Sequence, residues 1–182
     1  MKTEKQKMLD GEPYRPGDDQ LCLERSRAQR LMRAYNQTIV DDIDVRRPIL
    51  DQLLGAVGRD VAIRAPFYVD YGSNIYIGDN VFMNFGCVVL DVCKVVIGEH
   101  CLLGPCVQIY TADHPRDPRE RESGIEFGRP VTIGRNVWLG GHAIILPGVT
   151  IGDDVIVGAG SVVRHDVPSG ATVTGNPARV KS

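Results

Sequence analysis

The sequence lacks several features that define common protein classes. It has no apolar run of about 18 residues, so we expect no membrane-spanning helix. Its five cysteines are odd in number and include no Cys-x-x-Cys pair, which argues against a disulfide framework and a zinc site. The net charge of -2 leaves no basic excess for nucleic acid. We therefore expect a globular protein whose partners include neither nucleic acid nor a membrane.

A secretion signal is also missing. The first residues, MKTEKQKMLDGE, are polar and lack the apolar centre of a signal peptide. Hydrophobic residues make up 43% of the chain and charged residues 24%, an ordinary globular balance. The simplest interpretation of the unpaired cysteines is free thiols in a reducing compartment. We expect a cytoplasmic protein of one compact domain with a small appendage.

The first third of the chain predicts helices. Residues 18–37 carry apolar side chains at roughly helical spacing, and Asp18 or Asp19 stands where an N-cap residue would be. A second short helix is predicted to begin at Pro48, because proline suits the first helical position. We assign residues 1–57 to an N-terminal helical segment.

From residue 58 to 182 the sequence is dominated by a six-residue repeat. An aliphatic residue recurs at every sixth position, and a second small or branched residue stands two positions earlier. The longest unbroken series is Ile133, Leu139, Ile145, Ile151, Val157 and Val163. The same phase appears at Ile77, Met83 and Val89 and, after a two-residue slip, at Ile97, Leu103 and Ile109.

This period predicts a parallel β-helix. Residues two apart on a strand share a face, so each hexad is a short strand with two inward side chains and a turn. Three hexads close one triangular coil of about 18 residues, and stacked coils share one core. A sandwich or barrel of ordinary strands would not demand an unslipped period over six units. Cys87 and Cys101 fall at inward positions, whereas Asn84 should face outward.

One segment interrupts the repeat. Residues 115–130, PRDPRERESGIEFGRP, are rich in proline and charge and predict a loop inserted between coils. His114 stands at its base, where we expect it to be half covered beside a cleft. Histidine is the side chain best suited to act as a general base for a hydroxyl, although a surface histidine held by the loop is the competing interpretation. His100 and His142 occupy outward positions and are expected to be solvated.

Other chemistries have weaker signals. Some hexapeptide β-helices are zinc carbonic anhydrases, but the four histidines here form no tight His-x₄-His pair, so we expect no metal. A Cys–His nucleophile pair has no support beyond the presence of both residue types. Positive charge gathers near the C-terminus, which would suit cofactor phosphates, while a solvated tail explains Lys181 equally well. The residues concerned are Arg164, His165, Arg179 and Lys181.

Taken together, the motifs resemble the hexapeptide-repeat O-acetyltransferases, in the branch that contains the maltose, galactoside and nodulation acetyltransferases. The likeness covers nearly the whole chain, and the stretches NFGCVVLDVC, TADHP and GNPAR are specific to this branch. The resemblance implies a left-handed β-helix and a homotrimer with active sites between neighbouring chains. It also implies transfer of an acetyl group from acetyl-CoA to a hydroxyl of a maltose- or glucose-like sugar.

The resemblance also implies roles for individual residues. His114 matches the catalytic histidine, and Asn84 matches an asparagine that contacts both acceptor and acetyl-CoA. The acceptor pocket would be lined by Asp70, Phe82, Asn84 and Val92, with Asp91 supplying part of the polar contact. Phe82 and Val92 replace a tyrosine and an aspartate of the galactoside branch, which argues against galactoside specificity. Cofactor contacts would come from Asn84, Gly141, Ala159, Arg164, His165 and Arg179.

A mechanism follows from that resemblance. The acceptor hydroxyl would attack the thioester directly while neutral His114 accepts its proton, and an N–H near Gly141 would donate to the oxyanion. Two alternatives remain open. One is an acetyltransferase for a non-sugar acceptor, such as an antibiotic or an amino-acid hydroxyl. The other is a scaffold without activity, against which the retention of both Asn84 and His114 speaks.

Overall fold

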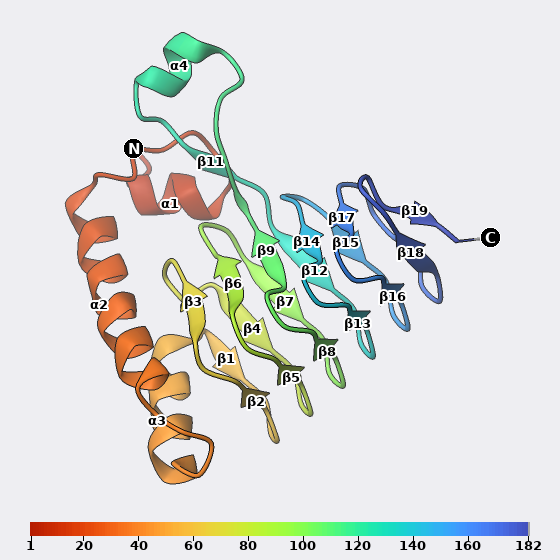
Figure 1. Ribbon diagram of the computed structural model, residues 1–182. Coiled ribbons are helices and arrows are strands. Elements are labelled where there is room, and N and C mark those ends of the chain that lie inside the picture. The colour runs from red at the N-terminus through yellow and green to blue at the C-terminus, as the bar shows by residue number, and fades with distance from the viewer. Residues whose placement is uncertain (182) are drawn as a thin grey trace.

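The computed structural model describes residues 1–181, and it confirms the predicted left-handed parallel β-helix (Figure 1). Three sheets run along the helix axis. The coils from β1 to β17 contribute one strand to each sheet, and β18 and β19 extend the second sheet alone. The first sheet contains β1 (Ala56–Val57), β4 (Ile75–Ile77), β7 (Val95–Ile97), β12 (Val131–Ile133) and β15 (Thr150–Ile151). The second contains β2 (Ala62–Ile63), β5 (Phe82–Met83), β8 (Leu102–Leu103), β13 (Trp138–Leu139), β16 (Ile156–Val157), β18 (Thr172–Thr174) and β19 (Arg179–Val180). The third contains β3 (Phe67–Val69), β6 (Cys87–Leu90), β9 (Gln108–Tyr110), β14 (Ile144–Ile145) and β17 (Val162–Val163).

The hexad series forms the core because strand pairing keeps it in register. Ile77 pairs with Ile97, which pairs with Ile133, and all three side chains are buried. Cys87 and Cys101 are fully buried, as predicted. Burying one isoleucine of the hexad series contributes about 1.5–3 kcal/mol to stability. We call the turns that follow the first, second and third sheets the first, second and third corners.

Three helices cover the start of the β-helix: α1 (Glu4–Leu9), α2 (Asp19–Asn36) and α3 (Ile43–Leu53). Asp18 caps α2 by accepting the N–H groups of Gln20 and Leu21, in agreement with the prediction. The predicted start of the next helix was wrong. It begins five residues before Pro48, because the N–H groups of Val45 and Arg46 already bond to the carbonyl of Asp42. The division of the chain at residue 57 stays a prediction.

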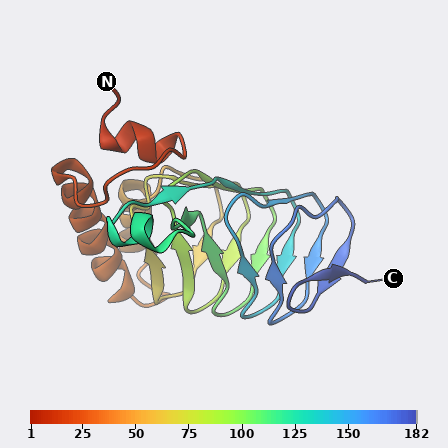
Figure 2. The same cartoon turned by 90° about the horizontal axis from the view of Figure 1, so that it is seen from above.

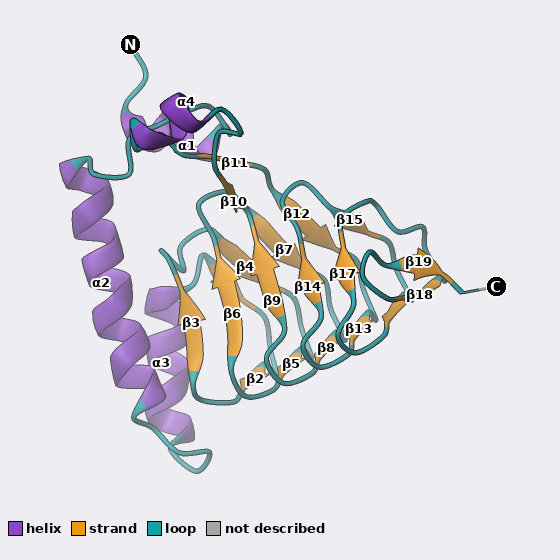
Figure 3. Ribbon diagram, turned by 45° about the horizontal axis from the view of Figure 1, so that its top comes forward, coloured by secondary structure: helices purple, strands orange, loops and turns teal. Residues whose placement is uncertain are grey.

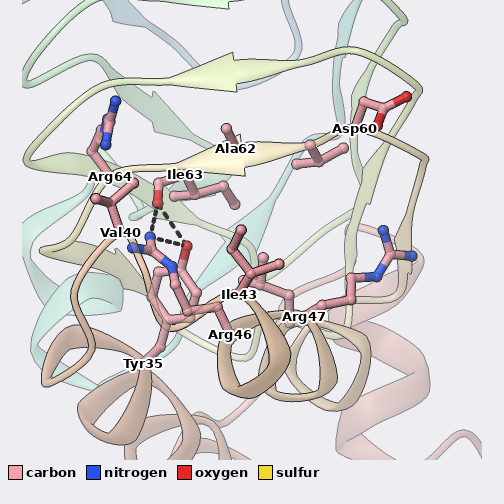
Figure 4. Close-up of a pocket in the computed structure, with 11 residues that line it drawn as sticks. Tyr35, Val40, Ile43, Arg46, Arg47, Asp60, Ala62, Ile63 and Arg64 are labelled. Carbon is pink, nitrogen blue, oxygen red and sulfur yellow. Dashed lines mark hydrogen bonds between the residues drawn. The ribbon is translucent and has the colours of Figure 1, made fainter.

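Side chains fasten these helices to the first coil (Figure 4). The Tyr35 hydroxyl donates to the carbonyl oxygen of Ile63 in β2 at 2.6 Å, and Arg46 donates to both groups. The Arg46 guanidinium also lies 4.7 Å from the centre of the Tyr35 ring. Tyr35, Arg46 and the carbonyl group of Ile63 therefore bond to one another where the helices pack on the first coil.

The inserted segment leaves the third corner after β9 and contains elements of its own. It consists of β10 (Ala112–Asp113), α4 (Pro118–Glu122) and β11 (Phe127–Gly128), with β10 and β11 paired antiparallel. The views in Figures 2 and 3 place it beside α1, at the end of the molecule that carries the helices. The C-terminal tail also folds back, because β19 pairs antiparallel with β18. None of the helices formed by residues 1–181 is both long and apolar enough to cross a membrane.

Candidate active site

The second corner stacks three of the predicted site residues along one edge. Asn84 follows β5, and Gly141 and Ala159 follow β13 and β16 in later coils. The coils are close here: a Cβ added to Gly140 would lie 2.5 Å from the backbone nitrogen of Ala159, so only glycine fits. Asn84 faces outward and is half-buried, and its amide oxygen accepts the N–H of Phe85. A groove of about 530 Å³ runs past all three residues.

This corner leaves backbone donors free. The N–H of Phe85 is taken by Asn84, and Pro105 has no N–H to offer. Within the described part of the chain, the N–H groups of Gly141 and Ala159 have no hydrogen-bond acceptor. Unpaired N–H groups at the edge of a groove can bind carbonyl oxygens of an extended ligand or an oxyanion.

An apolar ladder forms the other wall of the groove. Phe82 pairs with Leu102, Leu102 with Trp138, and Trp138 with Ile156, all on the outer face of the second sheet. The Trp138 side chain is 53% exposed. Phe82 was predicted, whereas Leu102, Trp138 and Ile156 were not, although each directly precedes an inward hexad residue and could have been found there. Such an exposed apolar face is suited to a ligand or another chain.

The third corner carries His114, directly after β10. Its N–H donates to Asp113 Oδ1 at 2.8 Å, and its carbonyl accepts from Arg116. The expectation of a half-covered side chain was wrong, because the imidazole is exposed where β10 leaves the coil. Although burial alone would raise the pKa of Asp113, hydrogen bonds from Arg116 and from the His114 N–H lower it. Asp113 is thus ionised and binds His114 and Arg116 at the start of the inserted loop.

Asp70 lies at the same corner in the first coil and is half-buried. Burial is the main cause that raises its pKa to about 6, the nearby Glu126 carboxylate raises it further, and Arg25 opposes both. Arg25 donates instead to the Tyr71 hydroxyl at 2.7 Å. Asp70 therefore presents a carboxyl group that protonates readily, on the side of the molecule where His114 stands.

Asp91 and Val92 occupy this corner but are enclosed. The Asp91 side chain has no exposed surface, and its carboxylate accepts the N–H groups of Asp70, Tyr71 and Asn74. Val92 is 3% exposed and packs in a small core with Tyr71. In this chain neither side chain has a surface for an acceptor. We correct both expectations and assign the two residues to the support of the corner.

The remaining predicted cofactor residues gather near the end of the β-helix. Arg164, His165 and Arg179 line one recess of about 230 Å³. Arg164 donates its Nε–H to His165 Nε2 at 3.1 Å, so that imidazole nitrogen acts as an acceptor. Arg164 and His165 follow β17 and thus stand at the third corner, away from Gly141 and Ala159.

The predicted catalytic and acceptor residues are therefore divided between two corners, and so are the predicted cofactor residues. The second corner holds Asn84, Gly141 and Ala159, whereas the third corner holds Asp70, His114, Arg164 and His165. The two corners lie at opposite ends of the third-sheet strands, roughly 15–20 Å apart for a six-residue hexad. A hydrogen bond requires about 3 Å, so one chain does not bring Asn84 and His114 together.

Within residues 1–181, the buried thiols of Cys87 and Cys93 are poorly suited to nucleophilic chemistry. Burial raises the pKa of Cys87 and of Cys93 to about 11, which disfavours the nucleophilic thiolate. Across the same residues no three His, Cys, Asp or Glu side chains gather in a group that could hold a metal ion.

Comparisons with known proteins add independent findings. Two family models match: the maltose acetyltransferase hexapeptide capping motif over residues 7–58, and the bacterial transferase hexapeptide (six repeats) over residues 130–165. Nodulation protein L of Rhizobium meliloti (strain 1021) is 53% identical over 180 residues, which cover 99% of this chain and 98% of the relative.

Two solved structures are similar over the whole chain. The crystal structure of a maltose O-acetyltransferase from Clostridium difficile 630 is 50% identical with a TM-score of 0.98, covering 100% of this chain and 97% of that one. A hexapeptide-repeat acetyltransferase from Vibrio cholerae O1 biovar eltor, complexed with acetyl coenzyme A, is 38% identical with a TM-score of 0.92. That match covers 100% of this chain and 98% of the other.

Proposed function

Because the chain belongs to the hexapeptide-repeat O-acetyltransferases and uses acetyl-CoA as its acetyl donor, we propose that it acetylates a hydroxyl of a small, maltose- or glucose-like sugar, with His114 as general base. The name of the similar maltose O-acetyltransferase supports a sugar acceptor. Phe82 in the groove supplies an apolar surface against which the C–H face of a sugar ring can pack.

The division of the site residues between two corners carries this proposal. The second corner of one copy would face the third corner of the next, so that Asn84 and His114 meet across the interface. An interface between two different surfaces repeats around a ring, and the family resemblance sets that ring at three copies. Acetyl-CoA would then lie along the groove. Gly141 and Ala159 would be on one side, and the third corner of the neighbouring copy would be on the other.

Each residue has a defined task in the transfer. His114 accepts the proton of the acceptor hydroxyl while that oxygen forms a bond to the acetyl carbonyl carbon. The free N–H of Gly141 donates to the carbonyl oxygen as negative charge develops there. When the carbon–sulfur bond breaks, His114 returns the proton to the sulfur of CoA. Asn84 orients the hydroxyl, and no covalent enzyme intermediate is needed because both substrates are held together.

Thiol release from acetyl-CoA, followed with a panel of acceptors, tests this proposal. The panel contains maltose, glucose, an alkyl galactoside, serine and chloramphenicol. We expect turnover with maltose or glucose that depends on His114. Release only with serine or chloramphenicol would overturn the sugar acceptor, whereas a lack of release with every acceptor would favour a scaffold.

A further inference from the structure

The N-terminal arm, residues 4–17, consists of α1 and an extended stretch that forms one antiparallel bridge with the inserted loop, between Tyr14 and Glu126. The N–H of Tyr14 donates to the carbonyl of Glu126 at 2.9 Å, and the N–H of Glu126 donates to the carbonyl of Tyr14 at 3.1 Å. Glu126 directly precedes β11, which pairs with β10. Three segments distant in sequence thus lie side by side, and the innermost, β10, ends one residue before His114.

Side chains reinforce this junction. The Tyr14 side chain is 1% exposed, and its hydroxyl donates to Glu126 Oε2 at 2.7 Å. Burial, followed by the contact with Glu126, raises the pKa of Tyr14, so the hydroxyl remains a donor at any ordinary pH. A buried hydroxyl bonded to a carboxylate is among the stronger neutral–charged hydrogen bonds. The arm therefore holds the C-terminal part of the inserted loop at Glu126.

Two glycines show how closely the parts approach. Gly11 has a φ of +74°, and a Cβ there would lie 2.8 Å from the carbonyl oxygen of Gly128. A Cβ on Gly128 would lie 2.6 Å from Cys93 Sγ and 2.7 Å from Val92 Cγ2. Gly128 of β11 thus lies in a slot between the arm and the third corner, where a side chain on Gly128 or on Gly11 would clash.

A separate small core lies beneath this slot. Its buried members are Met8, Tyr14, Leu21, Tyr71, Val92 and Cys93. Ala112 of β10 packs against this core, two residues before His114. The Cys93 thiol also donates to the carbonyl of Met8. The arm, the first turn of α2 and the corner therefore form one rigid base for β10.

We propose that the N-terminal arm is a positioning device for the catalytic base: it fixes His114 by clamping β11 against β10. Tyr14 and Gly11 are positioning residues, since neither is at the reacting atoms. This inference rests on the proposed role of His114. A displacement of a catalytic group by about 1 Å can cost on the order of 100-fold in rate, so a loosened clamp lowers turnover without touching the donor groove.

The test uses the full-length variants Tyr14→Phe and Gly11→Ala. Hydrogen–deuterium exchange of peptides spanning residues 110–116 and 125–129 reports whether the loop base loosens. Steady-state kinetics use acetyl-CoA and whichever of maltose, glucose and an alkyl galactoside turns over fastest. We expect faster exchange in both peptides and a kcat lowered about 3- to 10-fold for Tyr14→Phe and at least about 10-fold for Gly11→Ala. The KM for acetyl-CoA should stay within about twofold, because the second corner is untouched.

Gly17→Ala is the matched control, because a Cβ there meets nothing within 4 Å and the residue lies in the same arm. It should leave exchange and kcat unchanged. Unaltered exchange in both clamp variants would overturn the inference, and so would faster exchange with an unaltered kcat. A parallel His114→Ala variant separates the two claims. If it keeps normal turnover, the proposed base is wrong, whereas the exchange data still decide whether the arm holds the loop.

Discussion

At the second corner, the later coils turn with glycine and alanine, and within residues 1–181 the N–H groups of Gly141 and Ala159 are left unpaired along a groove. At the third corner, the chain buries a carboxylate, inserts a 16-residue segment between coils and recruits an N-terminal arm to hold it. The same repeat therefore supports two kinds of surface. Regular stacking makes a long binding edge, and the interruption of that stacking supplies a side chain for proton transfer.

The largest effect should come from removing that side chain. His114→Ala is expected to lower kcat on the order of 100-fold or more, because the imidazole is the proposed acceptor of the hydroxyl proton. The unfolding free energy should change little, since the imidazole is exposed and the hydrogen bonds of His114 within residues 1–181 involve its backbone. Activity assays and chemical denaturation check both parts. Normal turnover in this variant would show that His114 is not the general base.

Asp91→Ala separates support from recognition within the third corner. Two buried N–H groups and one partly buried N–H group would lose their acceptor, so we expect the free energy of unfolding to fall by about 2–4 kcal/mol. Asp91→Asn keeps one acceptor oxygen, so its free energy of unfolding should lie between that of Asp91→Ala and that of the wild type. Urea denaturation measures the loss. A raised acceptor KM with unchanged stability would instead assign Asp91 to the acceptor pocket.

Trp138→Ala tests the second corner's side of the comparison. If acetyl-CoA lies along this groove, loss of the exposed indole from the apolar ladder should raise the KM for acetyl-CoA about 10-fold, because a large apolar surface of the groove disappears. Tyr76→Ala is the control, since it removes an aromatic side chain that is 38% exposed from the first sheet. Equal KM values for the two variants would argue against donor binding along this ladder.

The smallest effect concerns pH. The pKa of folded Asp70 is raised to about 6 and that of Asp91 to about 7, mainly by burial, above the ordinary value near 4. Between about pH 5 and 7 the folded chain binds more protons than the unfolded chain, so the free energy of unfolding falls as pH rises. Asp70→Asn should flatten this slope by about 1 kcal/mol over the window, after allowance for partial exposure. An unchanged slope in denaturation midpoints would contradict the raised pKa of Asp70.

The regular half of the molecule could be predicted from the sequence because its determinants are local. The hexad phase specifies which side chains face inward, and Cys87 and Cys101 are buried accordingly. The N-cap at Asp18 was equally readable. Helix α1 was overlooked, although Thr3 and Gln6 form a capping box within four residues.

The interrupted corner could not be predicted in the same way. Asp91 looks like a polar surface residue in sequence, and its burial depends on N–H groups that the previous coil supplies about 20 residues earlier. The support of His114 depends on Tyr14, which lies 100 residues before it. Such contacts depend on tertiary packing, and no short-range period encodes them.

The most direct test of the shared site is to mix two inactive chains. His114→Ala and Asn84→Ala chains would be co-expressed with different tags, and the mixed oligomers purified and assayed for thiol release. If each site takes His114 from one copy and Asn84 from the next, every mixed trimer has one interface in three that pairs two intact residues. The purified mixed oligomers should therefore show about one third of the wild-type rate. A mixture no more active than the two separate variants would contradict a site formed between copies.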